Sequence, residues 1–255
     1  MDFIRGLFLS MDFPYLCVKT KKTFMVNFGK DYEKYAISQG IGSNKLYDYI
    51  KGINSMVSPT IIEERQMNVA AMDVFSRLMA DRIIFLGTGV DEDAANIIVS
   101  QMMYLNSVDS ESDIKLFLNS PGGSVTDGLA IYDIMQWVDC DVATYNIGLS
   151  ASMASILLSS GKRGKRYSLP HGRILVHQPM GGVPSHTQES DFAIAYEELK
   201  KYKETLYQIL HENTGKSIEE ITADADRDCW LSAQESLPKA YGEFGLIDEI
   251  LKKKK

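Results

Sequence analysis

The stretch GLSASMAS at residues 148–155 places three serines directly after a predicted buried strand. A serine becomes a nucleophile only where a neighbouring base can take its proton, so its place in the fold decides whether it reacts. The first five residues nearly match the G-x-S-x-G nucleophile elbow, which would favour Ser150, but Ser152 stands where the last glycine is required. Ser150 could also be only a helix N-cap, and we expect Ser155 to pack. Both the catalytic and the structural interpretation stay open on this spacing alone.

The sequence also contains candidates for a general base and for an oxyanion-binding turn. His177 ends the apolar run RILVH, which predicts a buried strand, and it could accept a proton or simply be a hydrogen-bonded core histidine. The turn SPGGS contains Gly122 and Gly123, which let the backbone bend sharply and bring N–H groups close to a ligand. Such groups can stabilise an oxyanion, although an ordinary turn between strand and helix has the same composition.

Alternating aspartates occupy DADRDCWLS, at positions 224, 226 and 228. With Glu235 at the twelfth place, the spacing resembles an EF-hand loop, but Cys229 stands where that loop needs glycine. We therefore expect no metal site here. One of these aspartates could instead orient a histidine, as the third member of a catalytic triad does.

Apolar periodicity predicts the elements that would hold these residues. From about residue 61, short apolar runs alternate with segments of helical spacing, which indicates a layered α/β fold. The longest periodic segment predicts a helix over 191–211. The predicted strands are 82–87, 114–119, 141–147 and 173–179, and the other predicted helices are 73–81, 94–106, 128–138 and roughly 150–160.

Composition limits the function classes. The chain has 255 residues with a net charge of −7, which argues against non-specific nucleic-acid binding. Its three cysteines form no C-x-x-C pair, so we expect neither a disulfide framework nor a cysteine zinc site. No segment has the apolar length of a membrane helix, and the start lacks a secretory pattern, so we expect a cytoplasmic protein.

Taken together, these motifs resemble ClpP, the proteolytic subunit family of the ATP-dependent Clp protease. The resemblance covers about 61–251 and includes FLNSPGGSVTDGLAIYDIMQWV, GLSASM, HQPMGG and DRDCWLSAQE. It implies a catalytic triad of Ser152, His177 and Asp228. It also implies that the backbone N–H groups of Gly123 and Met153 form the oxyanion hole.

The resemblance further implies a ClpP/crotonase-like spiral of ββα units with a protruding helix-strand handle at about 178–212. Subunits of the family form two stacked heptameric rings that enclose the active sites. An AAA+ unfoldase, such as a ClpX-like ATPase, feeds them unfolded proteins, so ATP is used by the partner and no cofactor is expected here. Arg227 would then contribute to contacts between rings, and Phe117 and Trp137 to docking of the ATPase.

The remaining expectations concern boundaries and alternatives. Residues 1–57 are expected to be an N-terminal extension, with a propeptide that ends around 53–57 and an axial segment, and 58–255 the protease domain. The chain has Leu149 and Ser150 where the family commonly has Gln-Ala, and Pro184 falls in the expected handle strand. The main alternative is a non-catalytic ring subunit with a structural or docking role. A crotonase-type acyl-CoA enzyme, which would use carboxylates, is a third possibility.

Overall fold

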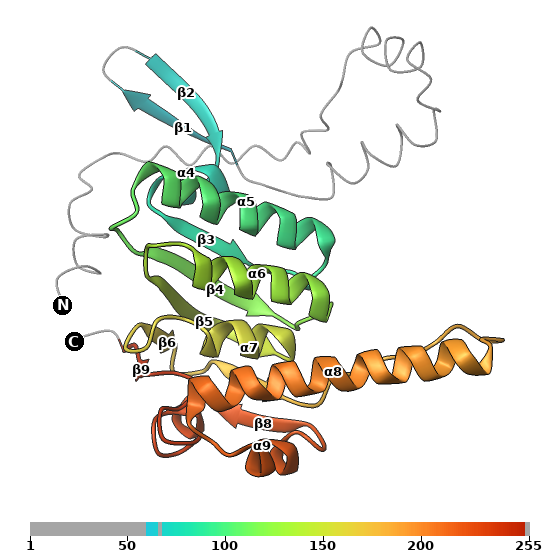
Figure 1. Cartoon of the computed structure of the whole chain (residues 1–255). Helices are drawn as coiled ribbons and strands as arrows, with labels where there is room; N and C mark the ends of the chain where they lie inside the picture. The colour runs from blue at the N-terminus through green and yellow to red at the C-terminus, as the bar shows by residue number, and fades with distance from the viewer. Residues whose placement is uncertain (1–59, 66–67, 253–255) are drawn as a thin grey trace, which may run out of the picture. The chain divides into compact units, whose positions relative to one another are not determined.

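The computed structural model describes residues 60–65 and 68–252, which belong to one compact unit that begins at Thr60. Its centre is a seven-stranded sheet with helices packed on it (Figure 1). The strands of this sheet are β3 (Ile83–Leu86), β4 (Ile114–Ser120), β5 (Val142–Ala151), β6 (Arg166–Ser168), β7 (Arg173–Val176), β8 (Cys229–Ser232) and β9 (Glu249–Ile250). A separate antiparallel hairpin pairs β1 (Thr60–Arg65) with β2 (Asn68–Asp73).

The helices follow the strands in the alternation that the sequence predicts. They are α4 (Val74–Ala80), α5 (Glu92–Val108), α6 (Val125–Trp137), α7 (Met153–Ser159), α8 (Glu189–Thr214) and α9 (Ile218–Asp224), with one 3₁₀ turn at Gln234–Ser236. Helices α5, α6 and α7 lie side by side over one face of the sheet (Figure 1). The mixed α/β architecture that the resemblance implied is therefore confirmed.

The sheet is parallel except at one pair. Strands β3, β4, β5, β6 and β9 are neighbours in that order, while β7 pairs in parallel with β5 and antiparallel with β8. Alternate residues of β4 face the helices and are fully buried, among them Leu116 and Leu118, while Phe117 points to the opposite face. The carboxyl ends of β4, β5 and β7 thus come together, and the candidate residues follow these three strands.

Strand β5 is longer than predicted, because it changes partner along its length. Residues 144–146 pair with β6, and residues 149–151 pair with β7. At the start of the second stretch, the Asn119 side chain accepts a hydrogen bond from the Leu149 N–H at 3.1 Å. The prediction that the helix starts near Ser150 was wrong: that residue lies in the strand, and its hydroxyl donates to Asn146 Oδ1 at 3.1 Å. The helix begins three residues later.

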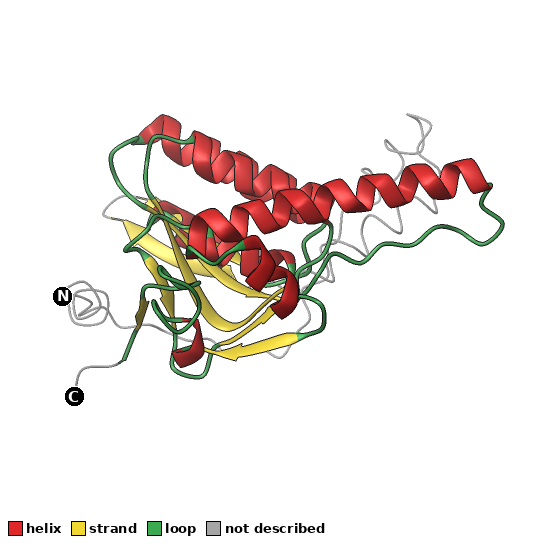
Figure 2. Cartoon of the chain, turned by 60° about the horizontal axis from the view of Figure 1, so that its bottom comes forward, coloured by secondary structure: helices red, strands yellow, loops and turns green. Residues whose placement is uncertain are grey.

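Helix α8 extends well beyond the body of the unit (Figure 2). Its buried residues all lie in its second half, from Leu206 to Thr214, whereas Phe192, Ile194 and Tyr196 near its start are exposed. Gly215 ends the helix in the left-handed conformation with φ 73°, as glycine commonly does. This is the helix of the expected handle.

The strand half of the handle does not form in this structure. Residues 177–188 connect the end of β7 to the start of α8 and form no regular secondary structure. Two adjacent glycines, Gly181 and Gly182, weaken a strand here, and Pro184 removes one of its backbone donors. A strand also needs a neighbour for its N–H and C=O groups, and no strand of the described residues pairs with this segment.

Candidate active site

Ser152 occupies a sharp turn between β5 and α7. Its backbone has φ 54° and ψ −124°, a conformation that residues other than glycine adopt only under strain. The N–H of Ser152 donates to the Leu175 carbonyl at 2.9 Å, and the Ser155 hydroxyl donates to the Ser152 carbonyl at 2.7 Å. Its own hydroxyl caps no helix N–H. The strand-turn-helix geometry of a nucleophile elbow is thus present, but it is centred on Ser152 and not on Ser150.

The glycine turn after β4 packs directly against this elbow. A Cβ atom at Gly122 would lie 2.7 Å from Ser152 Cβ and 2.9 Å from the Met153 nitrogen. The turn is tied to Val90 by bonds from the Val90 N–H to the Gly122 carbonyl and from the Ser124 N–H to the Val90 carbonyl. The N–H of Gly123 takes part in neither of these two hydrogen bonds.

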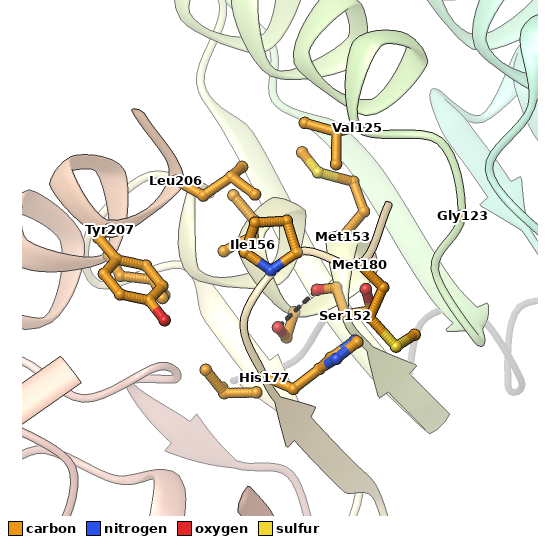
Figure 3. Close-up of a pocket in the computed structure, with 13 residues that line it drawn as sticks. Gly123, Val125, Ser152, Met153, Ile156, His177, Met180, Leu206 and Tyr207 are labelled. Carbon is orange, nitrogen blue, oxygen red and sulfur yellow. Dashed lines mark hydrogen bonds between the residues drawn. The ribbon is translucent and has the colours of Figure 1, made fainter. Parts of the chain in front are cut away.

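A cavity of about 80 Å³ joins these elements. Ser152, His177, Gly123 and Met153 all line it (Figure 3). Ser152 directly follows β5, His177 directly follows β7, Gly123 lies in the glycine turn, and Met153 begins α7. Met153 is the first residue of α7, where N–H groups have no acceptor within the helix. The pocket therefore contains a serine, a histidine and two backbone N–H groups that the sequence had indicated as candidates.

Asp228 directly precedes the first residue of β8 and is not one of the residues that line the cavity. In the antiparallel pair, Val176 is opposite Cys229, so one further step of this register brings His177 opposite Asp228. Gln178, the residue after His177, is also bonded to the segment that precedes β8, because its N–H donates to the Ala225 carbonyl at 2.8 Å. The Asp228 side chain is exposed in this structure.

Ser150 is fully buried and does not line the cavity. Its partner Asn146 is also buried and donates to Ser168 Oγ and to the Arg173 carbonyl at 3.2 and 3.3 Å. These bonds connect β5, β6 and β7 at the point where β5 changes partner. The serine that replaces alanine thus belongs to a structural polar network beneath the elbow.

The residues expected to bind partners lie away from the pocket. Phe117 stacks on Tyr145 with 4.5 Å between ring centroids, and Tyr145 stacks on Tyr167 at 4.9 Å. The parallel register places these three residues opposite one another on β4, β5 and β6. Trp137, at the end of α6, is 68% exposed. Neither tyrosine was predicted from the sequence, although strand alternation could have assigned both to the face of Phe117.

The acidic stretch before β8 gives no sign of a calcium loop. The Asp224 carboxylate forms an ion pair with Lys216, and Arg227 is exposed. Among residues 73–252, no three His, Cys, Asp or Glu side chains gather as metal ligands would. Helices of the part of the chain that the structure describes are too short or too polar to cross a bilayer.

Comparison with known proteins decides the family. The family model described as Clp protease matches residues 65–254, about three quarters of the chain. The chain belongs to the Clp protease family. Curated relatives named ATP-dependent Clp protease proteolytic subunit include one from Porphyromonas gingivalis, 51% identical over 224 residues that cover 88% of this chain and 98% of the relative.

Two further Clp protease subunits support the same assignment. One from Bacteroides fragilis is 50% identical over 88% of this chain and 99% of the relative, and one from Streptococcus sanguinis is 48% identical over 76% and 96%. The activity is accordingly that of a serine endopeptidase of the Clp type, and the non-catalytic alternative is not favoured.

Proposed function

We propose that Ser152 is the nucleophile with which this Clp protease cleaves unfolded polypeptides into small peptides. The observation that carries the proposal is the strained turn at Ser152, which opens into the same cavity as His177 and the two free N–H groups. Strain of this kind is retained where surrounding structure enforces it, and it projects the serine hydroxyl into the site.

The proposed reaction has two steps. Ser152 Oγ attacks the peptide carbonyl carbon while His177 takes its proton, and His177 then gives that proton to the amine that leaves. Water next attacks the ester on Ser152 with the same histidine as base, which releases the acid and restores the serine. Asp228 would hold the imidazole in one tautomer and stabilise its charged form.

The N–H groups of Gly123 and Met153 are the proposed oxyanion donors. The glycine turn and the first turn of α7 both border the cavity, so their donors can converge on the oxygen of a carbonyl held at Ser152. Preorganised donors of this kind stabilise the charge that develops in the transition state, and each is worth roughly a hundredfold or more in rate.

Peptide hydrolysis by Ser152→Ala, with Ser150→Ala as a matched control, tests the proposal. Both variants remove one hydroxyl, and the two positions are only two residues apart, but only Ser152 lines the cavity. We expect hydrolysis to be lost in Ser152→Ala and retained in Ser150→Ala. Activity retained in Ser152→Ala would contradict the assignment of the nucleophile.

For assembly, the proposal is two stacked heptameric rings with an AAA+ unfoldase, such as a ClpX-like ATPase, in the cytoplasm. The relatives are named ATP-dependent, and no ATP-binding loop of the Walker type occurs in this sequence. In this assembly the exposed half of α8 buries its apolar side chains between the two rings. Arg227 is proposed to contribute to the same contacts between rings. Phe117, Tyr145, Tyr167 and Trp137 would form the ATPase docking surface.

Negative-stain microscopy combined with a protein-degradation assay tests this assembly. Double rings that degrade an unfolded protein only with an AAA+ partner and ATP would support it. Rings that never cleave a peptide, even with the ATPase, would instead favour a structural subunit.

Residues 1–57, which lie outside the described residues, are proposed to include a propeptide removed by the protease itself. A match of 224 residues within a chain of 255 must begin no later than residue 32, so the Porphyromonas gingivalis relative has a counterpart to part of this segment. Intact mass of wild type and Ser152→Ala tests self-processing: we expect only the inactive variant to keep residues 1–50. Retention in both would contradict it.

A further inference from the structure

The cavity beside Ser152 has a mostly apolar wall. Its lining includes Val125, Met153, Ile156, Leu206 and Leu210, supplied by α6, α7 and α8. In a serine peptidase, the cavity next to the nucleophile receives the side chain of the residue whose carbonyl is attacked, called the acyl residue below. If Ser152 acts as proposed, this cavity selects the acyl residue.

Most polar side chains that line this cavity already have a role. Ser152 and His177 are the proposed reacting groups, and the Ser155 hydroxyl donates to the Ser152 carbonyl. Tyr207 is the remaining one. Its ring comes from α8, with the hydroxyl end directed toward the His177 side of the pocket (Figure 3).

The Tyr207 hydroxyl is buried without a hydrogen-bond partner. The residue is only 4% exposed, and no donor or acceptor of the described residues bonds to its oxygen. A buried polar group without a partner destabilises the fold, so its persistence at a binding cavity calls for an explanation. A ligand that supplies the partner would remove this cost on binding.

The surroundings of the hydroxyl favour its role as a donor. Burial raises the pKa of Tyr207, and the negative charge of Asp226 raises it further. The phenol therefore stays protonated well above neutral pH and keeps its hydrogen available. The Lys203 ammonium lies 5.3 Å from the centroid of the Tyr207 ring, over its face, and Lys203 is not itself one of the residues that line the cavity.

We propose that Tyr207 is a specificity-determining residue, whose hydroxyl donates a hydrogen bond to an acceptor atom near the end of the acyl residue's side chain. Glutamine and methionine carry such an acceptor on an unbranched chain. Norleucine has nearly the same length and shape without a good acceptor. The inference rests on the proposed function, since it assumes that this cavity adjoins the nucleophile.

Three fluorogenic peptides that differ only in the acyl residue test this role. The full chain is assayed with glutamine, methionine or norleucine at that position, and kcat/KM for each acceptor peptide is divided by that for norleucine. In Tyr207→Phe we expect the glutamine ratio to fall at least threefold and up to about tenfold, the range that one hydrogen bond supplies. The methionine ratio should fall less, because a thioether is a weak acceptor.

Tyr241→Phe is the matched control. Tyr241 is a buried tyrosine of similar exposure, 2%, that does not line the cavity. We expect its ratios to equal those of wild type. A glutamine ratio that falls less than threefold in Tyr207→Phe, or falls equally in Tyr241→Phe, overturns the inference.

Two further measurements separate this inference from the proposed function. Hydrolysis retained in Ser152→Ala would reject the nucleophile, whatever the ratios are. If Ser152→Ala is inactive and the ratios do not change in Tyr207→Phe, only the role of Tyr207 fails. Thermal unfolding of Tyr207→Phe should occur at or above the wild-type temperature, because the lost hydroxyl had no partner within the fold; a clear fall would indicate a structural hydrogen bond and overturn the inference.

Discussion

Gly122 packs against Ser152 so closely that a Cβ atom on the glycine would lie 2.7 Å from the Cβ of the serine. The same atom would lie 2.5 Å from the Ala151 carbonyl oxygen, and the glycine has φ 84°. Both the contact and the backbone conformation therefore exclude a side chain at this position. The glycine turn fixes the elbow from one side, while β7 fixes it from the other.

Gly122→Ala should therefore displace the nucleophile. We expect the free energy of unfolding to fall by about 1–3 kcal/mol and kcat/KM for a short peptide to fall by roughly a hundredfold, because small misplacements at a reacting centre are costly. Denaturant titration and a peptidase assay measure the two effects. Gly89→Ala is the control: its Cβ would meet only the Gly122 carbonyl oxygen, at 3.6 Å, and should have little effect on either.

Asp228→Asn tests whether the strand register identifies the third member of the triad. An amide at this position cannot hold the imidazole in the correct tautomer or balance its charge, so kcat should fall by about 10³–10⁴ with the fold intact. Asp226→Asn is the matched control, because it changes an exposed carboxylate two residues away. Equal losses in the two variants would contradict the assignment of Asp228.

How far the sequence predicted the site depends on the residue. The order of strands and helices and the junction that carries Ser152 follow from local apolar spacing, which is why they were predictable. The end of β5 was not predictable in this way, because Ser150 is held in the strand by pairing with β7, which is distant in sequence. Its hydrogen bond to Asn146 also has no signal in apolar spacing. Strand β8 was missed for the same reason: CWLS is too short to show alternation before it pairs with β7. Helix α9 was also missed, although the capping box of Ser217 and Glu220 is a local signal that could have indicated its start.

The triad shows the same limit. Spacing alone favoured Ser150, through its likeness to a nucleophile elbow, and gave no reason to choose among three aspartates. The resemblance chose one of each, and the geometry supplies physical reasons: the strained φ at Ser152 and the register that leads from Val176 and Cys229 to His177 and Asp228. The unpaired hydroxyl of Tyr207 has no signature in sequence, because it depends on which groups surround it.

Arg166→Met should strongly destabilise the fold. The guanidinium is buried and bonds to the Asp248 carboxylate at 2.6 Å and to the carbonyls of Ser159 and Asn213 at 3.2 and 3.1 Å. It thereby connects the ends of α7 and α8 to the C-terminal segment. Its removal leaves a largely buried carboxylate that keeps two backbone N–H donors but has no countercharge, so we expect a loss of about 3–5 kcal/mol in denaturant titration at neutral pH. Lys201→Met, which removes an exposed ion pair with Glu198, should cause no measurable change.

The same pair predicts how stability depends on pH. Burial raises the pKa of Asp248, but hydrogen bonds from Arg166 and its charge outweigh burial, so the pKa lies below the ordinary value. The stabilisation is therefore present above the unfolded pKa of about 3.9 and is lost as pH falls through the lower folded value. We expect the difference in unfolding free energy between wild type and Arg166→Met to shrink below about pH 4. A difference that stays constant down to pH 2 would contradict this account.

Ser150→Ala should affect stability and not chemistry. Its hydroxyl makes one buried hydrogen bond, to Asn146 Oδ1, so its removal should cost about 1 kcal/mol in unfolding free energy. Peptide hydrolysis should stay within a few-fold of wild type, because the cavity does not include this residue. A loss of hydrolysis as complete as that expected for Ser152→Ala would mean that the network beneath the elbow is part of the catalytic machinery.

The central claim is that Ser152, and neither neighbouring serine, is the reactive nucleophile. The most direct test is to label the full chain with a fluorophosphonate probe and to locate the modified residue by peptide mass spectrometry, in wild type and in Ser152→Ala. We predict a single adduct at Ser152 that is absent from the variant and unchanged in Ser150→Ala. An adduct at Ser150 or Ser155, or labelling that persists in Ser152→Ala, would contradict the account.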